Sequence, residues 1–74
     1  MAKHSMAILL GRAVRARREA AGVSQDQFAD RIDMHRAYYA AIERGEKNVT
    51  LPTLKRVAEG LRVPMSELLR DTGN

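Results

Sequence analysis

Apolar residues recur every three or four positions along most of the chain, which is the spacing of amphipathic helices. Leu10, Val14 and the aliphatic stem of Arg18 follow one another at i, i+4 and i+8, so they lie on one face of a first helix. This helix is expected over about residues 6–21, and Gly22 is placed to end it. Sustained alternation of apolar and polar residues, which would indicate strands, is absent. The pattern therefore favours an all-α protein.

A second and a third helix follow this first one. Ser24 and Gln27 form an S-x-x-Q capping box that opens the second helix. A turn at residues 33–35 leads to a third helix from about Arg36 to Arg44, which Gly45 ends. The inward positions that the spacing gives to these two helices are Phe28, Ala29, Ile32, Tyr39 and Ile42.

Two more helices complete the chain. Thr50 is the expected N-cap of the fourth helix, and Pro52 is tolerated in its first turn because the N–H groups there lack helical partners anyway. Val63 and Pro64 break the chain before a short fifth helix over about residues 65–69. The apolar positions of the fourth helix expected to face inward are Leu51, Leu54, Val57, Ala58 and Leu61. We predict a compact domain of five helices.

The length of 74 residues fits one small domain. We expect residues 1–6 to form a flexible arm, residues 7–70 the single folded domain, and residues 71–74 a polar C-terminal tail. A chain of this size buries only about 60% of its unfolded surface, so its stability is expected to be marginal unless it oligomerises.

The charge of the chain points to a polyanionic partner. Thirteen Lys and Arg residues against nine Asp and Glu give a net charge of +4, and the pI is about 10.1. A pI above about 9 is typical of nucleic-acid-binding domains. There are no cysteines, and no apolar run approaches the roughly 18 residues of a membrane span. We expect a soluble cytoplasmic protein without a cofactor, a metal ion or a small-molecule ligand.

Residues 24–45 have the spacing of a helix-turn-helix, since two short helices are joined there by a three-residue turn. Ala29 supplies the small side chain that is needed where the two helices cross. Asp33 stands where the turn needs a residue that tolerates a positive φ. Each feature alone is weak, and the combination predicts a DNA-binding motif.

The segments LGRAVRARREAAGVSQDQFADRI and HRAYYAAIERGEKNVTLPTLKRVAEGLRVPMSELL resemble the Xre family, the repressor/Cro type of helix-turn-helix regulators. The resemblance covers about Leu10 to Leu69, and its HR-x-Y…IERG-x-x-N-x-TL variant is similar to controller proteins of restriction–modification systems. The sequence departs from the family in three places, where Asp33 replaces a glycine, His35 a Ser or Thr cap, and Tyr39 a β-branched aliphatic residue.

The resemblance implies a repressor-like DNA-binding domain whose third helix enters the major groove. The implied base contacts are Arg36, Ala37, Tyr38 and Ala41. The implied phosphate contacts are Gln25, His35, Arg44, Lys47 and Asn48. Glu43 is expected to pair with Arg18 inside the fold. The implied function is that of a sequence-specific, DNA-binding transcriptional regulator.

Other interpretations stay open for several of these residues. Arg36 is alternatively a solvated surface arginine, Tyr38 packs beside Tyr39, and Gln25 is simply a good helix former. An antitoxin or another protein-binding partner of the same fold is the alternative function. An enzyme is not expected, because no acids, bases or metal ligands converge in the sequence. A membrane-surface helix is excluded because the arginines of the first helix are spread around it.

The C-terminal segment carries more apolar residues than one short helix buries against its own core. The residues expected at an interface between two copies are Val63, Met65, Leu68 and Leu69. A two-fold homodimer through this segment would cover them on both chains. It would also set two third helices about 34 Å apart, so the operator is expected to be an inverted repeat.

Overall fold

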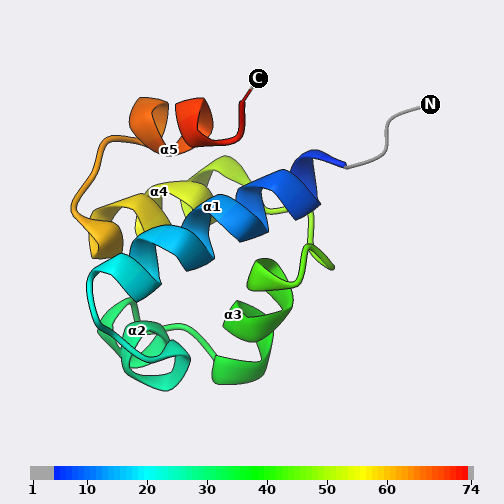
Figure 1. Ribbon diagram of the computed structural model, residues 1–74. Helices are drawn as coiled ribbons and strands as arrows, with labels where there is room; N and C mark the ends of the chain where they lie inside the picture. The colour runs from blue at the N-terminus through cyan, green and yellow to red at the C-terminus, as the bar shows by residue number, and fades with distance from the viewer. Residues whose placement is uncertain (1–4, 74) are drawn as a thin grey trace.

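The computed structural model describes residues 5–73, and this part of the chain contains five helices and no strand (Figure 1). The helices are α1 (Met6–Ala20), α2 (Gln25–Arg31), α3 (Arg36–Glu43), α4 (Leu51–Leu61) and α5 (Met65–Asp71). Helix α1 lies between α5 on one side and α2 and α3 on the other, and it packs against α3, α4 and α5. The prediction of an all-α, five-helix fold is confirmed.

The predicted helix ends rest on short-range hydrogen bonds. Ser24 Oγ accepts from the backbone N–H of Gln27, and the Gln27 side chain accepts from the backbone N–H of Ser24, at 3.1 and 3.0 Å. Thr50 caps α4, since its side-chain hydroxyl oxygen accepts a hydrogen bond from the backbone N–H of Thr53. Gly22 and Gly45 follow α1 and α3 with positive φ angles of 74° and 78°. The expected capping box, cap and stops are all present.

The N-terminal arm is shorter than predicted. Ser5 is the N-cap of α1, since its Oγ accepts from the backbone N–H of Ile8 at 3.2 Å, and Met6 is the first helical residue. The arm therefore does not extend to Met6. Residues 1–4, the rest of the predicted arm, lie outside the described residues.

The predicted C-terminal tail is wrong at its first two positions. Asp71 is the last residue of α5, and Thr72 is buried with 7% of its surface exposed. Thr72 Oγ1 donates to the carbonyl oxygen of Leu69 at 2.6 Å, which satisfies the buried hydroxyl. The folded unit thus includes residues beyond 70, while Asn74 lies outside the described residues.

The core lies where the helices meet, and nearly all of the predicted inward positions contribute to it. The large side chains with 2% or less of their surface exposed are Tyr39, Phe28, Ile42, Leu68, Val14 and Val57. Leu51 is the exception, because 70% of its surface is exposed. It is the first residue of α4, where the helix face extends beyond its neighbours, so helical spacing alone placed it wrongly inside.

Gly11 permits a close approach of α1 to the last turn of α3. A Cβ atom at this position would lie 2.5 Å from the carbonyl oxygen of Ile42 and 2.6 Å from that of Glu43. Because both are backbone atoms, the two helices would have to separate to accommodate any side chain. The approach brings the face of α1 that carries Arg18 against α3.

Within residues 5–73, none of the helices combines the length and the apolar character that crossing a membrane requires. The same residues contain no group of three or more His, Cys, Asp or Glu side chains arranged to hold a metal ion.

Candidate nucleic-acid interface

Helices α2 and α3 form a helix-turn-helix whose turn has the predicted geometry. Asp33 adopts a φ of 55°, which is the left-handed conformation expected at this position. The N–H of Met34 donates to the carbonyl oxygen of Ala29 at 2.8 Å and closes the turn. Ala29 is fully buried, and the rings of Phe28 and Tyr39 pack with their centroids 5.1 Å apart. These contacts hold α3 at a fixed angle to α2.

The structure brings Arg18 and Glu43 together as a buried ion pair. Arg18 Nε and Nη2 donate to the two carboxylate oxygens of Glu43 at 2.6 and 3.1 Å. Only 9% and 2% of the two side chains are exposed. Arg18 Nη1 also donates to the carbonyl oxygen of Val23 at 2.7 Å. The guanidinium therefore connects α1 with α3 and with the loop before α2.

Two further side chains complete the hydrogen bonding of Glu43. Gln25 Nε2 donates to Glu43 Oε1 at 2.8 Å, and the Tyr39 hydroxyl donates to Glu43 Oε2. Burial acts to raise the pKa of Glu43, but the hydrogen bonds from Arg18, Gln25 and Tyr39 outweigh it and hold that pKa below its ordinary value. Burial and the bond to Glu43 raise the pKa of Tyr39, which stays neutral and donates. We call these four side chains the buried network.

The predicted base-contacting residues are not equally accessible on α3. Arg36 and Ala37 are exposed at its first turn, and Tyr38 is half-buried with Lys47 Nζ 5.8 Å from its ring centroid. Ala41 retains only 4% of its surface, because neighbouring atoms of the fold enclose its small side chain. The prediction that Ala41 contacts a base is therefore wrong for this surface. His35 is the N-cap residue of α3 and is exposed, without a side-chain capping bond.

The predicted phosphate contacts lie at two ends of this surface. Gln25 is half-buried at the beginning of α2, where its amide is bound to Glu43. Arg44, Lys47 and Asn48 are exposed at the end of α3 and in the loop that follows. Arg44 donates to both carboxylate oxygens of Glu46 at 2.9 and 3.0 Å, so part of its charge is balanced within the loop.

Two aspartates of α2 hold the guanidinium of Arg36. Arg36 Nη1 lies 3.2 Å from Asp26 Oδ2, and Nη2 lies 3.1 Å from Asp30 Oδ2. Asp30 and Asp26 together raise the pKa of Arg36, so the arginine is always charged. More than half of each side chain is exposed.

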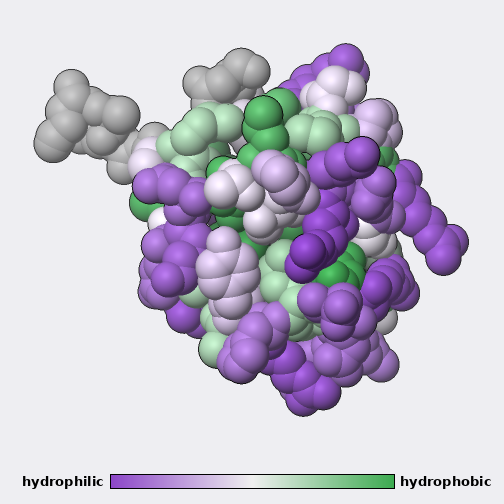
Figure 2. Space-filling model, turned by 180° about the vertical axis from the view of Figure 1, so that it is seen from behind, coloured by the Kyte–Doolittle hydropathy of each residue, from purple (hydrophilic) through white to green (hydrophobic). Residues whose placement is uncertain are grey.

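The C-terminal apolar residues divide into core and surface. Leu68 is fully buried in its own chain, so its assignment to a dimer interface is wrong. Val63 and Met65 are half-buried, whereas Leu69 exposes 36% and Met6 of α1 exposes 46% of its surface. Met6 and Leu69 line one groove together with residues of α1, α4 and the loop before α4. Figure 2 shows apolar surface gathered in the upper part of the face seen from behind, whereas hydrophilic side chains dominate its lower part.

Comparison with known proteins identifies the family to which this arrangement belongs. The family described as Helix-turn-helix matches residues 14–68. The control protein C.MunI of a Mycoplasma species is 44% identical over 55 residues, which cover 74% of each chain. The chain belongs to the helix-turn-helix family, among the control proteins. It is a DNA-binding transcriptional regulator, as the resemblance to the Xre family implied.

Two solved structures extend the likeness from the sequence to the fold. The restriction–modification controller protein C.AhdI from Aeromonas hydrophila is 32% identical, with a TM-score of 0.80 over 84% of this chain and 94% of that one. The clp gene regulator ClgR from Corynebacterium glutamicum is 25% identical, with a TM-score of 0.93 over 97% of this chain and 92% of that one. The likeness of fold thus extends over 84% to 97% of this chain.

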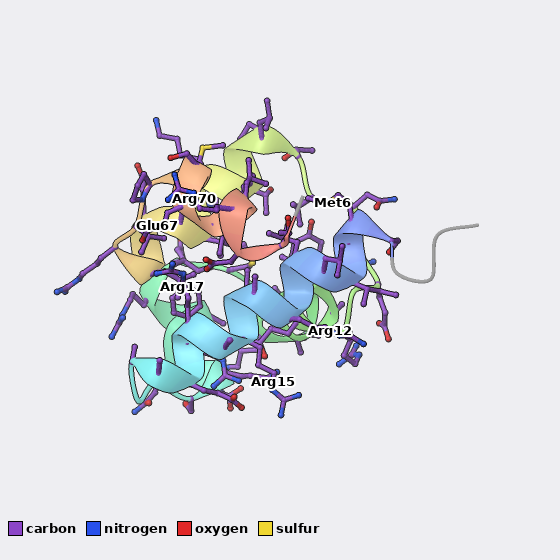
Figure 3. All side chains as sticks on the ribbon, turned by 45° about the horizontal axis from the view of Figure 1, so that its top comes forward. Met6, Arg12, Arg15, Arg17, Glu67 and Arg70 are labelled. Atoms are coloured by element: carbon purple, nitrogen blue, oxygen red, sulfur yellow. The ribbon has the colours of Figure 1, made fainter. Side chains whose placement is uncertain are left out.

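Several residues of the site have roles that the sequence interpretation missed. Tyr39 and Glu43 are spaced i, i+4 on α3, a spacing from which their hydrogen bond was predictable. Asp26 and Asp30 have the same spacing on α2, but their contact with Arg36 depends on the angle between the helices. Arg17 pairs with Asp71 and, at 3.3 Å, with Glu67, which fixes α5 to α1. In Figure 3, Arg17 reaches toward Glu67, whereas Arg12 and Arg15 lie on the other side of α1.

Proposed function

We propose that this control protein binds an inverted-repeat operator as a homodimer, with α3 of each subunit in the major groove. The observation that carries this proposal is the exposed guanidinium of Arg36 at the first residue of α3, on a helix held firmly by the turn and the buried network. In the helix-turn-helix motif the N-terminal residues of the second helix contact base edges. Because the proposed partner is DNA and the relatives named above come from bacteria, the proposed place of action is the cytoplasm.

The accessible side chains suggest a division of roles. Arg36 is the proposed base reader, since a guanidinium donates two parallel hydrogen bonds to O6 and N7 of guanine. Ala37 offers a small apolar contact at the same end of α3, and Tyr38 contacts a thymine methyl group or a phosphate. The residues proposed to bind the sugar–phosphate backbone are Gln25, His35, Arg44, Lys47 and Asn48. Gln25 retains a second amide proton for this purpose while the first binds Glu43.

Replacing Arg36 by alanine is expected to weaken binding to the operator by about 5- to 150-fold and to relax the preference at one base pair of each half-site. The operator is first recovered from a random-sequence duplex library with the wild-type protein. Binding of Arg36→Ala is then measured on that operator and on single-base variants of it. Arg56→Ala, which removes an exposed arginine from α4, is the matched control and retains the preference. If the affinities for operator and shuffled DNA fell equally, Arg36 would contact only a phosphate and would not read a base.

The proposed dimer uses the exposed part of the C-terminal apolar surface. Leu69 and the half-buried Met65 are spaced i, i+4 on α5, so they form a stripe that a second copy covers by two-fold symmetry. Leu69→Asp is expected to convert a dimer into a monomer at micromolar concentration in analytical ultracentrifugation. Ser66→Asp places the same charge on the exposed part of α5 and leaves the dimer intact. A wild-type monomer at every concentration, or a dimer indifferent to Leu69→Asp, contradicts this arrangement.

A further inference from the structure

Arg36, the first residue of α3, is already bound to two carboxylates. Asp26 and Asp30 are one helical turn apart on α2, and each has one oxygen within 3.2 Å of a different Nη atom of Arg36. The three side chains expose 58%, 64% and 63% of their surface, so the cluster lies in the open. We call these three residues the acidic clamp.

The charge of the acidic clamp opposes the charge of the proposed partner. One guanidinium and two carboxylates give a local charge of −1 on a protein whose net charge is +4. Non-specific binding to DNA comes essentially from cations that replace the counterions of phosphate groups. Within the clamp Arg36 is already neutralised, and the two aspartates repel a phosphate that approaches it. The clamp therefore weakens any contact between this end of α3 and a phosphate backbone.

The edge of a guanine base can replace both aspartates as the hydrogen-bond acceptor of Arg36. The two parallel hydrogen bonds to O6 and N7 replace the two bonds to the aspartates, donor for donor. A phosphate also accepts two hydrogen bonds from a guanidinium, but unlike a guanine edge it brings a full negative charge against Asp26 and Asp30. The clamp therefore costs binding energy on all DNA, but more of this cost is recovered where a guanine is present.

We propose that Asp26 and Asp30 are specificity-determining residues, which hold Arg36 and thereby lower the affinity for random DNA more than the affinity for the operator. This inference rests on the proposed function, because it takes α3 as the element that meets DNA. The clamp is not needed for the fold, since ion pairs between exposed side chains contribute little to stability. Substituting the aspartates consequently leaves the melting temperature close to that of the wild type.

The test compares the full-length wild-type protein with Asp26→Asn, Asp30→Asn and the double variant on two probes. One probe is the operator recovered from the library by the wild type, and the other is a duplex of the same composition in shuffled order. Each single variant is expected to bind the shuffled duplex up to about fivefold more tightly, which is the size of one surface pair. The double variant loses part of the ratio between operator and shuffled affinities. Its salt dependence on the shuffled duplex is steeper by about one unit per subunit, since Arg36 now neutralises a phosphate.

Two controls separate the clamp from a general effect of charge. Glu19→Gln removes the same charge and frees Arg15, with which Glu19 pairs at 3.1 Å on α1. This variant is expected to leave the specificity ratio unchanged. In an Arg36→Ala background the two aspartate substitutions are expected to improve binding to shuffled DNA less than in the wild type, because only the repulsion between the carboxylates and phosphate is relieved and no arginine remains to be released.

Several outcomes would overturn the inference. An unchanged ratio in the double variant, an equal effect of Glu19→Gln, or a gain that is just as large without Arg36 would each show that the clamp does not set specificity. A loss of operator affinity alone would instead make the aspartates positioning residues that aim Arg36 at guanine. If the wild type enriches no sequence from the library, the proposed function itself fails, and this result differs from all of the others.

Discussion

Replacing Glu43 by alanine is expected to lower the free energy of unfolding by about 3–5 kcal/mol, the usual cost of stranding one charge of a buried pair. The guanidinium of Arg18 would stay enclosed with only 9% of its side chain exposed, and it would lose both of its bonds to the carboxylate. Gln25 and Tyr39 would lose their acceptor as well. A protein of this length has a total stability of roughly 4–11 kcal/mol at 0.05–0.15 kcal/mol per residue. The substitution is therefore expected to remove a large share of the total stability and to lower the melting temperature markedly.

Thermal or urea unfolding followed by circular dichroism measures this effect. Glu46→Ala is the matched control, because it also removes a glutamate that pairs with an arginine, but in an exposed position. It is expected to shift the melting temperature only slightly. The double variant Arg18→Met/Glu43→Leu removes both charges and should recover much of the stability that either single substitution loses. An unchanged melting temperature for Glu43→Ala would show that the buried network does not hold the helices together.

Acid acts on the same carboxylate without any substitution. The hydrogen bonds of the network lower the pKa of Glu43 in the folded state below its ordinary value of 4.5. A depressed folded-state pKa stabilises the fold above the unfolded-state value, and this stabilisation is lost as the pH falls through the folded-state value. The contribution of the network is therefore complete near neutral pH and decreases only in the acid range below about 4.5.

The helix ends and the helix-turn-helix were predictable because their signals are short-range. The capping box joins Ser24 to Gln27, which are three residues apart, and the turn needs a positive φ at Asp33 alone. Such interactions depend on the identity and spacing of neighbouring residues, which the sequence displays directly. Burial of Tyr39 and Phe28 followed from helical periodicity in the same way.

The interactions that the sequence did not disclose join residues that are distant along the chain. Arg17 and Asp71 are 54 residues apart, and Gln25 and Glu43 are 18 apart. Neither pair has a local signal, since each depends on how two helices pack. Periodicity likewise marks apolar residues without telling how far a neighbouring helix extends over them, so Leu51 was placed inside. The resemblance to a family supplied the pairing of Arg18 with Glu43, which spacing alone did not.

The affinity for DNA is expected to fall by about 10³- to 10⁵-fold between 50 and 200 mM salt, as for a protein that contacts roughly 6–10 phosphates. A dimer supplies these contacts twice, from the loop after α3 and from the beginning of α2. Within residues 5–73, Lys47 forms no ion pair with a carboxylate, whereas Arg44 is held by Glu46. Lys47 is therefore the residue whose loss should change the salt dependence most clearly.

Lys47→Ala is expected to flatten the plot of log K against log salt concentration by about one unit per subunit and to weaken operator and shuffled duplexes alike. Lys55→Ala removes the same charge from the exposed side of α4 and should leave the slope unchanged. Fluorescence anisotropy with a labelled operator over a series of salt concentrations measures both variants. A wild-type slope near zero would show that contacts with the phosphate backbone are not the main source of affinity. A slope that Lys47→Ala and Lys55→Ala reduce equally would place the contact surface more broadly over the protein than α3 and its loop.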